Sequence, residues 1–301
     1  MERATLTALA ADRPRWTAYV ELLKPITWFP PMWAFGCGVI SSGGSLIERW
    51  PFAVGGILLA GPMVCGTSQV VNDWFDRHVD AINEPNRPIP SGRVPGRQGL
   101  YFAIIWSLAS VGVAGLLGSW VIAATLVGLA LAWAYSAPPF RLKRNGWYGN
   151  AAVGICYEGL PWFTAAAVLL GTLPPGEILW LALLYSIGAH GIMTLNDFKS
   201  ISGDRMMNVH TLPVQLGVQQ AARFAGLVMI APQVVVAGLL LSWGQQIAAI
   251  IIGGLIVGQL VLLRRFLSDP IKFATWFSGF GVTLYVSGML ASAIAVRGVA
   301  G

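Results

Sequence analysis

The sequence predicts an all-α membrane protein in which nine transmembrane helices surround a central cavity. Three observations predict this class. Hydrophobic residues make up 55% of the 301 residues and charged residues make up 11%, against about 25% charged in an ordinary soluble domain. So few charges cannot cover the surface of a soluble fold. The charges also lie in short segments between long apolar runs, so the net charge of +6 does not indicate nucleic-acid binding.

Nine apolar runs are long enough to cross a bilayer, which takes about 20 residues of helix. They are residues 25–43, 51–72, 99–118, 119–137, 148–170, 177–196, 219–242, 245–263 and 273–296. Several contain glycine and proline, which membrane helices tolerate better than soluble ones. The separations at Gly118-Ser119 and at Trp243-Gly244 are short and predict tight turns. The 36 glycines predict helices that approach one another closely.

The segment before the first span, residues 1–24, has no uninterrupted apolar stretch after its charges, so it does not predict a signal peptide. We interpret it as a cytoplasmic arm with a surface helix anchored by Trp16 and Tyr19. Residues 25–301 are then expected to form a single transmembrane domain.

The lysines and arginines fall almost entirely on one side of the predicted topology. Seventeen of the 19 lie in the arm and in the loops that share its side, and only Arg49 and Arg297 lie on the other. Loops rich in Lys and Arg face the cytoplasm. The sequence therefore predicts a multi-pass protein of the cell inner membrane, with a cytoplasmic N-terminus and a periplasmic C-terminus.

Two acid-rich motifs stand at the cytoplasmic ends of the second and sixth spans. Residues 72–80 read Asn-Asp-Trp-Phe-Asp-Arg-His-Val-Asp, and residues 196–204 read Asn-Asp-Phe-Lys-Ser-Ile-Ser-Gly-Asp. Both begin with Asn-Asp-aromatic, and both have an aspartate seven residues after the first one. Since four spans separate them, we interpret the motifs as an internal repeat whose two copies face one cavity.

If each helix continues through its motif, the spacing i, i+3, i+7 places three side chains in one sector of the helix. These are Asp73, Asp76 and Asp80 in the first motif and Asp197, Ser200 and Asp204 in the second. Carboxylates on one stripe repel one another unless a cation lies between them. Oxygen ligands without histidine or cysteine suit Mg²⁺, which usually also binds substrate phosphates.

We therefore predict two or three Mg²⁺ ions that hold a diphosphate. The predicted metal ligands are Asn72, Asp73, Asp76, Asp80, Asp197 and Asp204. For either motif alone, a solvated acidic segment that ends a helix is the alternative. Two motifs in matching register make this alternative weaker.

Basic residues are expected to complete the site. The fourth span ends in residues 135–143, where prolines stiffen the chain and bring Arg141 and Lys143 to the face of the acids. Charge-assisted hydrogen bonds to phosphate would follow. On this segment alone, plain positive-inside anchors explain the two residues equally well. The predicted diphosphate contacts are Asn72, Arg77, Arg141, Lys143 and Lys199, with Arg87 as a further candidate.

With Asn-Asp-x-x-Asp-x-x-x-Asp at residues 72–80 of a nine-span membrane protein, the sequence resembles the UbiA superfamily of intramembrane aromatic prenyltransferases. The resemblance covers the whole chain. Within the superfamily, residues 73–92, 135–143 and 196–205 are similar to the chlorophyll and bacteriochlorophyll synthases. The resemblance implies a UbiA-like fold in which both motifs bind Mg-diphosphate with help from the loop of Arg141 and Lys143.

The resemblance also implies a reaction. The enzyme would esterify the propionate of a (bacterio)chlorophyllide with geranylgeranyl or phytyl diphosphate and release diphosphate, in the pigment biosynthesis of photosynthesis. Positively charged groups would stabilise the leaving diphosphate. The residues predicted to act in catalysis are Asp73, Asp76, Arg141, Lys143 and Lys199. The acceptor carboxylate is already ionised near neutral pH, so no general base is required.

One position departs from the wider superfamily. Many members have a carboxylate where this sequence has Ser200, and Lys199 stands beside it. The second motif is therefore expected to be the weaker metal site. A contact from Lys199 to the diphosphate is expected to replace the missing carboxylate.

Two ionisable residues inside predicted spans are candidates to bind the pigment, since buried charge in lipid points to function. Glu158 lies near mid-membrane, and His190 precedes Asp197 by seven residues on the same helical face. For His190, an interhelical hydrogen bond is the favoured alternative. For Glu158, a neutral acid with a hydrogen-bond partner is an equally good explanation.

Three other functions are weighed against this one. A related prenyltransferase would use haem or a quinone precursor as the acceptor. A transporter would place its acids near the midplane, whereas these lie at span ends. A pigment-assembly scaffold would not depend on the acids. The expected partners are the two substrates and membrane lipid, with pigment-biosynthesis proteins as candidates and no nucleic acid.

Overall fold

The computed structural model describes residues 15–297, and within this range the regular structure is helical apart from an isolated bridge between Asn145 and His210. The all-α prediction is confirmed. The first half comprises α2 (Arg15–Leu22), α3 (Phe29–Ser42), α4 (Leu46–Leu58), η2 (Leu59–Cys65), α5 (Gly66–Asn83), α6 (Gln98–Leu117) and α7 (Ser119–Ser136). The second half comprises α8 (Gly146–Gly154), η4 (Ile155–Gly159), α9 (Leu160–Leu170), α10 (Gly176–Asp197), α11 (Ile201–Met206), α12 (Leu212–Leu216), α13 (Val218–Ser242), α14 (Gln246–Ser268) and α15 (Pro270–Val296).

Among the described residues, 8 helices are long and apolar enough to cross a membrane. They correspond to the predicted spans from the second to the ninth. The first predicted span, residues 25–43, is a short 3-10 turn followed by α3, which has only 14 residues. Pro30 and Pro31 explain this difference, because proline lacks the N–H that a continuous helix requires and clashes with the preceding turn. The predicted tight turns are present at Gly118 and around Gly244.

The predicted surface helix of the N-terminal arm is α2, and residues 1–14 of the arm lie outside the described residues. The Tyr19 ring packs against Phe102 with centroids 5.0 Å apart, and its hydroxyl donates to Gln98. Trp16 is exposed. Of the two predicted anchors, Tyr19 therefore attaches the helix to the bundle, through α6.

Two of the membrane-spanning helices contain a π-helical segment. The helix from Leu46 to Asn83 is continuous over 38 residues and includes η2, while η4 interrupts the helix from Gly146 to Leu170. Such wider turns are frequent at functional sites. Here both segments contribute to the wall of the same cavity, described below.

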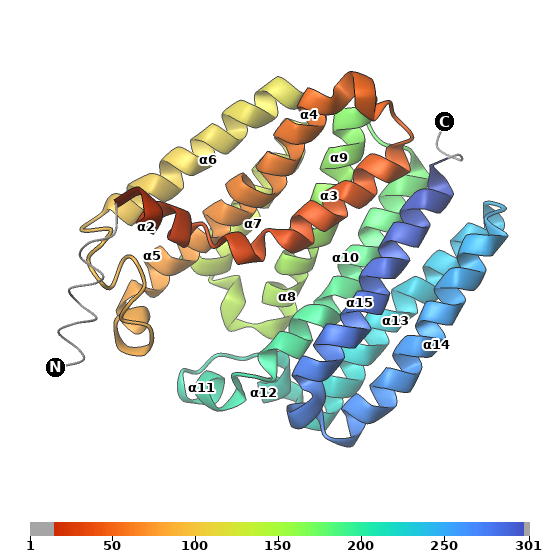
Figure 1. Ribbon diagram of the computed structural model, residues 1–301. Helices are drawn as coiled ribbons and strands as arrows, with labels where there is room; N and C mark the ends of the chain where they lie inside the picture. Colours follow the sequence, from red (N-terminus) through yellow and green to blue (C-terminus); the bar gives the residue numbers. More distant parts are fainter. Residues whose placement is uncertain (1–14, 298–301) are drawn as a thin grey trace.

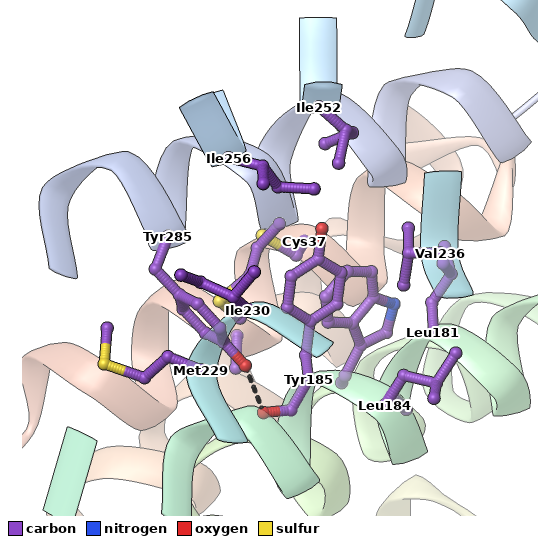
Figure 2. Close-up of a cluster of buried hydrophobic side chains, with 14 of the residues drawn as sticks. Cys37, Leu181, Leu184, Tyr185, Met229, Ile230, Val236, Ile252, Ile256 and Tyr285 are labelled. Carbon is purple, nitrogen blue, oxygen red and sulfur yellow. Dashed lines mark hydrogen bonds between the residues drawn. The ribbon is translucent and has the colours of Figure 1, made fainter. Parts of the chain in front are cut away.

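The largest buried cluster joins α3, α9, α10, α13, α14 and α15. Figure 2 shows Tyr185 and Tyr285 at its centre, among aliphatic side chains such as Ile252. The Tyr285 hydroxyl donates to the Tyr185 carbonyl over 2.6 Å, which satisfies both groups in an apolar interior. Gly188 makes this possible, because a Cβ at that position would collide with the Tyr285 hydroxyl.

The bundle brings the ends of α5 and α10 to one end of the molecule. In Figure 1, α11 and α12 lie at this end, together with the start of α8 and the loop after α5. α15 begins at the same end and finishes at the opposite one. The motifs at residues 72–80 and 196–204 therefore open toward the same side of the bundle, as the sequence predicts.

Candidate active site

The first acidic motif lies on an unbroken helix. α5 extends to Asn83, so Asp73, Asp76 and Asp80 occupy one stripe three and seven residues apart, as predicted. Asp73 is only 1% exposed, Asp80 is also buried, and Asp76 is partly exposed. Three carboxylates are thus held close together where little water reaches two of them, which requires compensating positive charge.

Cations from two other segments supply this charge to Asp73 and Asp80. The Lys24 ammonium lies 2.6 Å from Asp73 Oδ1. The Arg87 guanidinium contacts Asp80 Oδ2 at 2.8 Å and Asp73 Oδ1 at 3.3 Å. Burial alone would lower the pKa of Arg87, but the charges of Asp73 and Asp80 raise it above the ordinary arginine value. The second oxygen of Asp73, Oδ2, is buried and has no hydrogen-bond partner among the described residues.

Lys24 is a site residue that the sequence analysis missed. It precedes the first predicted span and takes a left-handed backbone conformation (φ 45°) before Pro25. This bend turns the chain at the membrane mouth, from which the side chain reaches Asp73. A lysine followed by proline at the start of a span was a visible signal, but the contact joins residues 49 apart in the chain.

The loop after α7 supplies the cation for Asp76. Lys143 Nζ lies 2.5 Å from Asp76 Oδ2, which places Lys143 at the acids as predicted. Burial lowers the pKa of Lys143, while the hydrogen bond to Asp76 opposes this shift. Arg141 takes a left-handed conformation (φ 43°), and its buried Nε finds no partner among the described residues. This N–H lies in the same loop as Lys143, whose charge Arg141 is close enough to influence.

The second motif differs from its prediction. α10 ends at Asp197 and α11 begins at Ile201, so Asp197, Ser200 and Asp204 do not lie on one continuous helix. At the break, the N–H groups of Phe198, Lys199 and Ser200 donate to carbonyls three residues back instead of four, which ends the α-helical series. The Ser200 hydroxyl donates to the Asp204 carboxylate over 2.7 Å. Asp204 also accepts a hydrogen bond from Thr211.

One segment connects the two motifs. Lys143 reaches Asp76 of the first motif, and Asn150, on the helix that follows, donates to Asp197 of the second over 3.2 Å. The backbone of this segment also bonds to His210, which follows the second motif: the Gly146 N–H donates to the His210 carbonyl, and the His210 N–H donates to the Arg144 carbonyl. The two motifs therefore lie on the same side of the bundle and close enough to be bridged by a single short segment.

The residues fit a magnesium-bound diphosphate in their chemistry. Their donors are carboxylate and amide oxygens, the ligands that Mg²⁺ prefers, and the unpaired Asp73 Oδ2 is a buried acceptor without a donor. In the conformation described for residues 15–297, no three acidic, imidazole or thiol side chains converge on one point that could hold a metal ion. Lys24, Arg87 and Lys143 instead neutralise the acids. A metal at the first motif would compete with these three cations for the carboxylate oxygens.

Two predicted diphosphate contacts, Arg77 and Lys199, make no contact with the acids in this structure. The Arg77 guanidinium stacks over the Trp74 ring at 4.2 Å and donates to the Trp74 carbonyl, so it is committed to its own helix. Lys199 is exposed in the turn between α10 and α11. Neither side chain contacts the acids, whereas the further candidate Arg87 does.

An apolar cavity of about 200 Å³ begins at the first motif. It is lined by Val64, Cys65, Ser68, Gln69, Asn72, Gly128, Leu131, Ala132, Tyr135, Ala152, Val153, Cys156, Tyr157 and Met193. Asn72 belongs to the motif and donates to Ser136, and Met193 is one turn before Asp197. The cavity therefore leads from the acids into the membrane-spanning part of the bundle, between α5, α7, α8 and α10.

Glu158 and His190, the predicted pigment ligands, do not line this cavity. His190 Nε2 lies 3.2 Å from the Trp147 carbonyl, which is the interhelical hydrogen bond of the alternative interpretation. Glu158 is buried in η4 at 5% exposure, and its Oε2 has no partner among the described residues. For Glu158, the structure thus does not supply the partner that a neutral, paired acid would have.

Comparisons with known proteins agree with this arrangement. The UbiA prenyltransferase family model matches residues 23–294. The chain is 54% identical to the bacteriochlorophyll synthase 33 kDa chain of Cereibacter sphaeroides, covering 95% of each chain. It is 39% identical to the chloroplastic chlorophyll synthase of Avena sativa, over 93% of this chain and 76% of that protein. A UbiA homolog from Archaeoglobus fulgidus, solved with GPP and Mg²⁺, superposes with a TM-score of 0.69 at 20% identity, over 91% of this chain and 99% of that one.

Proposed function

The chain belongs to the UbiA prenyltransferase family, and from this premise we propose that it esterifies the propionate of a (bacterio)chlorophyllide with a prenyl diphosphate. Diphosphate is the other product. The observation that carries the proposal is the joining of two acidic motifs by Lys143 and Asn150 at the mouth of an apolar cavity. Relatives with 54% and 39% identity are named as bacteriochlorophyll and chlorophyll synthases, which supports the same acceptor class here.

The polar end of the site would bind the diphosphate. Mg²⁺, held by Asn72, the aspartates of the first motif, Asp197 and Asp204, would neutralise the diphosphate and favour its departure. Lys24 and Lys143, displaced from Asp73 and Asp76, would then turn toward the phosphate oxygens. Arg141 would donate its free Nε–H to the same group. These charges are fixed before the allylic C–O bond breaks, which is the condition for electrostatic catalysis.

The apolar end would hold the prenyl chain. The allylic carbon would lie at the mouth of the cavity near Asn72 and Tyr135, with its hydrocarbon tail among Val64, Leu131 and other apolar groups. Water is scarce in such a space, so the allylic cation is protected from hydrolysis. The acceptor carboxylate attacks in its ionised form, and no proton has to be removed.

Orientation in the membrane follows from charge. Seventeen of the 19 lysines and arginines lie on the predicted side of the N-terminus, which is also the side of both acidic motifs. We place this side in the cytoplasm, so that water-soluble Mg²⁺ reaches the site from there. The C-terminus is then periplasmic, and the membrane is the cell inner membrane.

The decisive assay uses the purified full-length chain in nanodiscs with Mg²⁺. Geranylgeranyl and phytyl diphosphate are each offered with chlorophyllide, bacteriochlorophyllide, haem and 4-hydroxybenzoate, and the products are separated by chromatography. We expect esterified pigment with one or both chlorophyllides. Alkylation of haem or hydroxybenzoate alone would contradict the proposed acceptor, and Mg²⁺ flux in proteoliposomes without any prenyl donor would favour the transport alternative.

A further inference from the structure

Gly128 stands at the joint between two cavities. Beyond the main cavity lies a second one of about 30 Å³, whose walls include Leu59 and Leu160. Three residues, Val64, Gly128 and Cys156, line both cavities. They come from η2, α7 and η4, so the two π-helical segments and α7 form the boundary.

The absence of a side chain at Gly128 sets the width of this boundary. A Cβ there would lie 3.3 Å from Val64 Cγ1 and 3.5 Å from Leu160 Cδ1. The Cys156 thiol is 3.9 Å from the Gly128 carbonyl on the same boundary. Alanine would therefore fit tightly, and any longer side chain would fill the space between the cavities.

The volumes indicate what crosses this boundary. An apolar cavity of about 150 Å³ accommodates a benzene molecule. The main cavity, at about 200 Å³, is therefore too small for a chain of four isoprene units. On the same scale, about 200 Å³ corresponds to roughly eight carbon atoms, close to the ten of two isoprene units and well below the twenty of four units. Ser136 marks the polar end of the main cavity, because it accepts a hydrogen bond from Asn72 of the first motif. Gly128 lies eight residues before Ser136 on α7, so about 12 Å of helix separates the two positions.

We propose that Gly128 determines which prenyl chain length the enzyme accepts, by leaving a passage through which the distal isoprene units enter the second cavity. This inference rests on the proposed function, since it assumes that the main cavity holds a prenyl diphosphate. The second cavity would then widen around the chain end, with apolar groups such as Leu59 and Leu160 as its walls.

The test is the affinity of the full-length protein for two unreactive donor analogues, geranyl and geranylgeranyl thiolodiphosphate, measured by calorimetry with Mg²⁺. Gly128→Leu should weaken the four-unit analogue by at least about tenfold relative to the two-unit analogue, because the distal units lose their apolar surroundings. Gly128→Ala should have a smaller effect in the same direction. Gly112→Leu on lipid-facing α6, where nothing lies within 4 Å, is the matched control and should bind both analogues normally.

Leu160→Phe provides a second test if Gly128→Leu folds poorly, because it fills the second cavity from the opposite helix without touching the main one. It should show the same selective loss of the four-unit analogue. Equal weakening of both analogues by the two variants, or no weakening of either, would overturn the role of Gly128. Failure of the wild-type protein to bind either analogue would instead contradict the proposed function, so the two failures are distinguishable.

Discussion

Replacement of Lys143 by methionine tests the electrostatic account of catalysis at a single contact. Lys143→Met keeps a long apolar side chain in the loop but removes the ammonium that lies 2.5 Å from Asp76. In the proposed mechanism, this ammonium contacts the diphosphate before the C–O bond breaks, and the contact strengthens as negative charge develops on the leaving group. The expected loss is therefore a loss of transition-state stabilisation, seen in kcat.

The magnitude follows from the surroundings of the pair. Two unit charges 4 Å apart at an effective dielectric constant of 20 interact by about 4 kcal/mol. The Lys143 and Asp76 side chains are 19% and 31% exposed, so water screens part of this energy. About 3 kcal/mol remains for a contact to the departing diphosphate, which corresponds to a loss of about 10²–10³ in kcat.

The assay is the initial rate of pigment esterification at saturating donor and Mg²⁺, in nanodiscs. Arg144→Met is the matched control, because Arg144 is the adjacent, exposed cation of the same loop. We expect the control to remain within about twofold of the wild-type rate, since surface charges contribute little. Thermal unfolding of both variants separates activity from folding. A loss below tenfold for Lys143→Met, or an equal loss for Arg144→Met, would refute the reasoning.

Three further outcomes follow from the same structure. Burial lowers the pKa of Lys143 in the substrate-free protein below the ordinary lysine value of 10.5, so kcat/KM should fall on the alkaline side at a pH below 10.5 as Lys143 loses its proton. Lys143→Arg should move this limb of the pH profile to higher pH. Asp73→Asn should lower kcat by about 10² or more and raise the Mg²⁺ concentration for half-maximal rate; an unchanged Mg²⁺ dependence would remove Asp73 from the metal site. Gly188→Ala should destabilise the protein by about 1–3 kcal/mol, because its Cβ meets the Tyr285 hydroxyl, whereas Gly253→Ala in open space on α14 should be neutral or stabilising in thermal unfolding.

The helices and the first motif were predictable because local pattern determines them. Apolar runs bounded by charge identify the spans, and the i, i+3, i+7 spacing of Asp73, Asp76 and Asp80 requires only that one helix continues, as α5 does. The short α3 was also visible in principle, since Pro30 and Pro31 stand within the first predicted span. Their effect on helix length was outweighed there by the hydrophobicity of the run.

The parts that were not predicted depend on contacts between distant segments. Lys24 contacts Asp73, which is 49 residues later in the chain, and no local sequence pattern predicts this contact. The break between Asp197 and Ile201 appears in the backbone, where Phe198, Lys199 and Ser200 donate to carbonyls three residues back, whereas the spacing of the acids alone favours a continuous helix. The cavity arises where η2 and η4 approach α7, and a π-helical turn has no sequence signature comparable to a helix cap.

The central claim, that both acidic motifs hold one metal-bound diphosphate, is tested most directly by diffraction from crystals grown with Mn²⁺ and geranylgeranyl thiolodiphosphate. Anomalous scattering locates the metal ions independently of the protein. The account predicts Mn²⁺ at the aspartates of residues 72–80 and at Asp197 or Asp204, with a single diphosphate between them and the Lys24 and Lys143 side chains turned away from Asp73 and Asp76. Metal at only one motif, or a diphosphate bound outside the space between them, would contradict it.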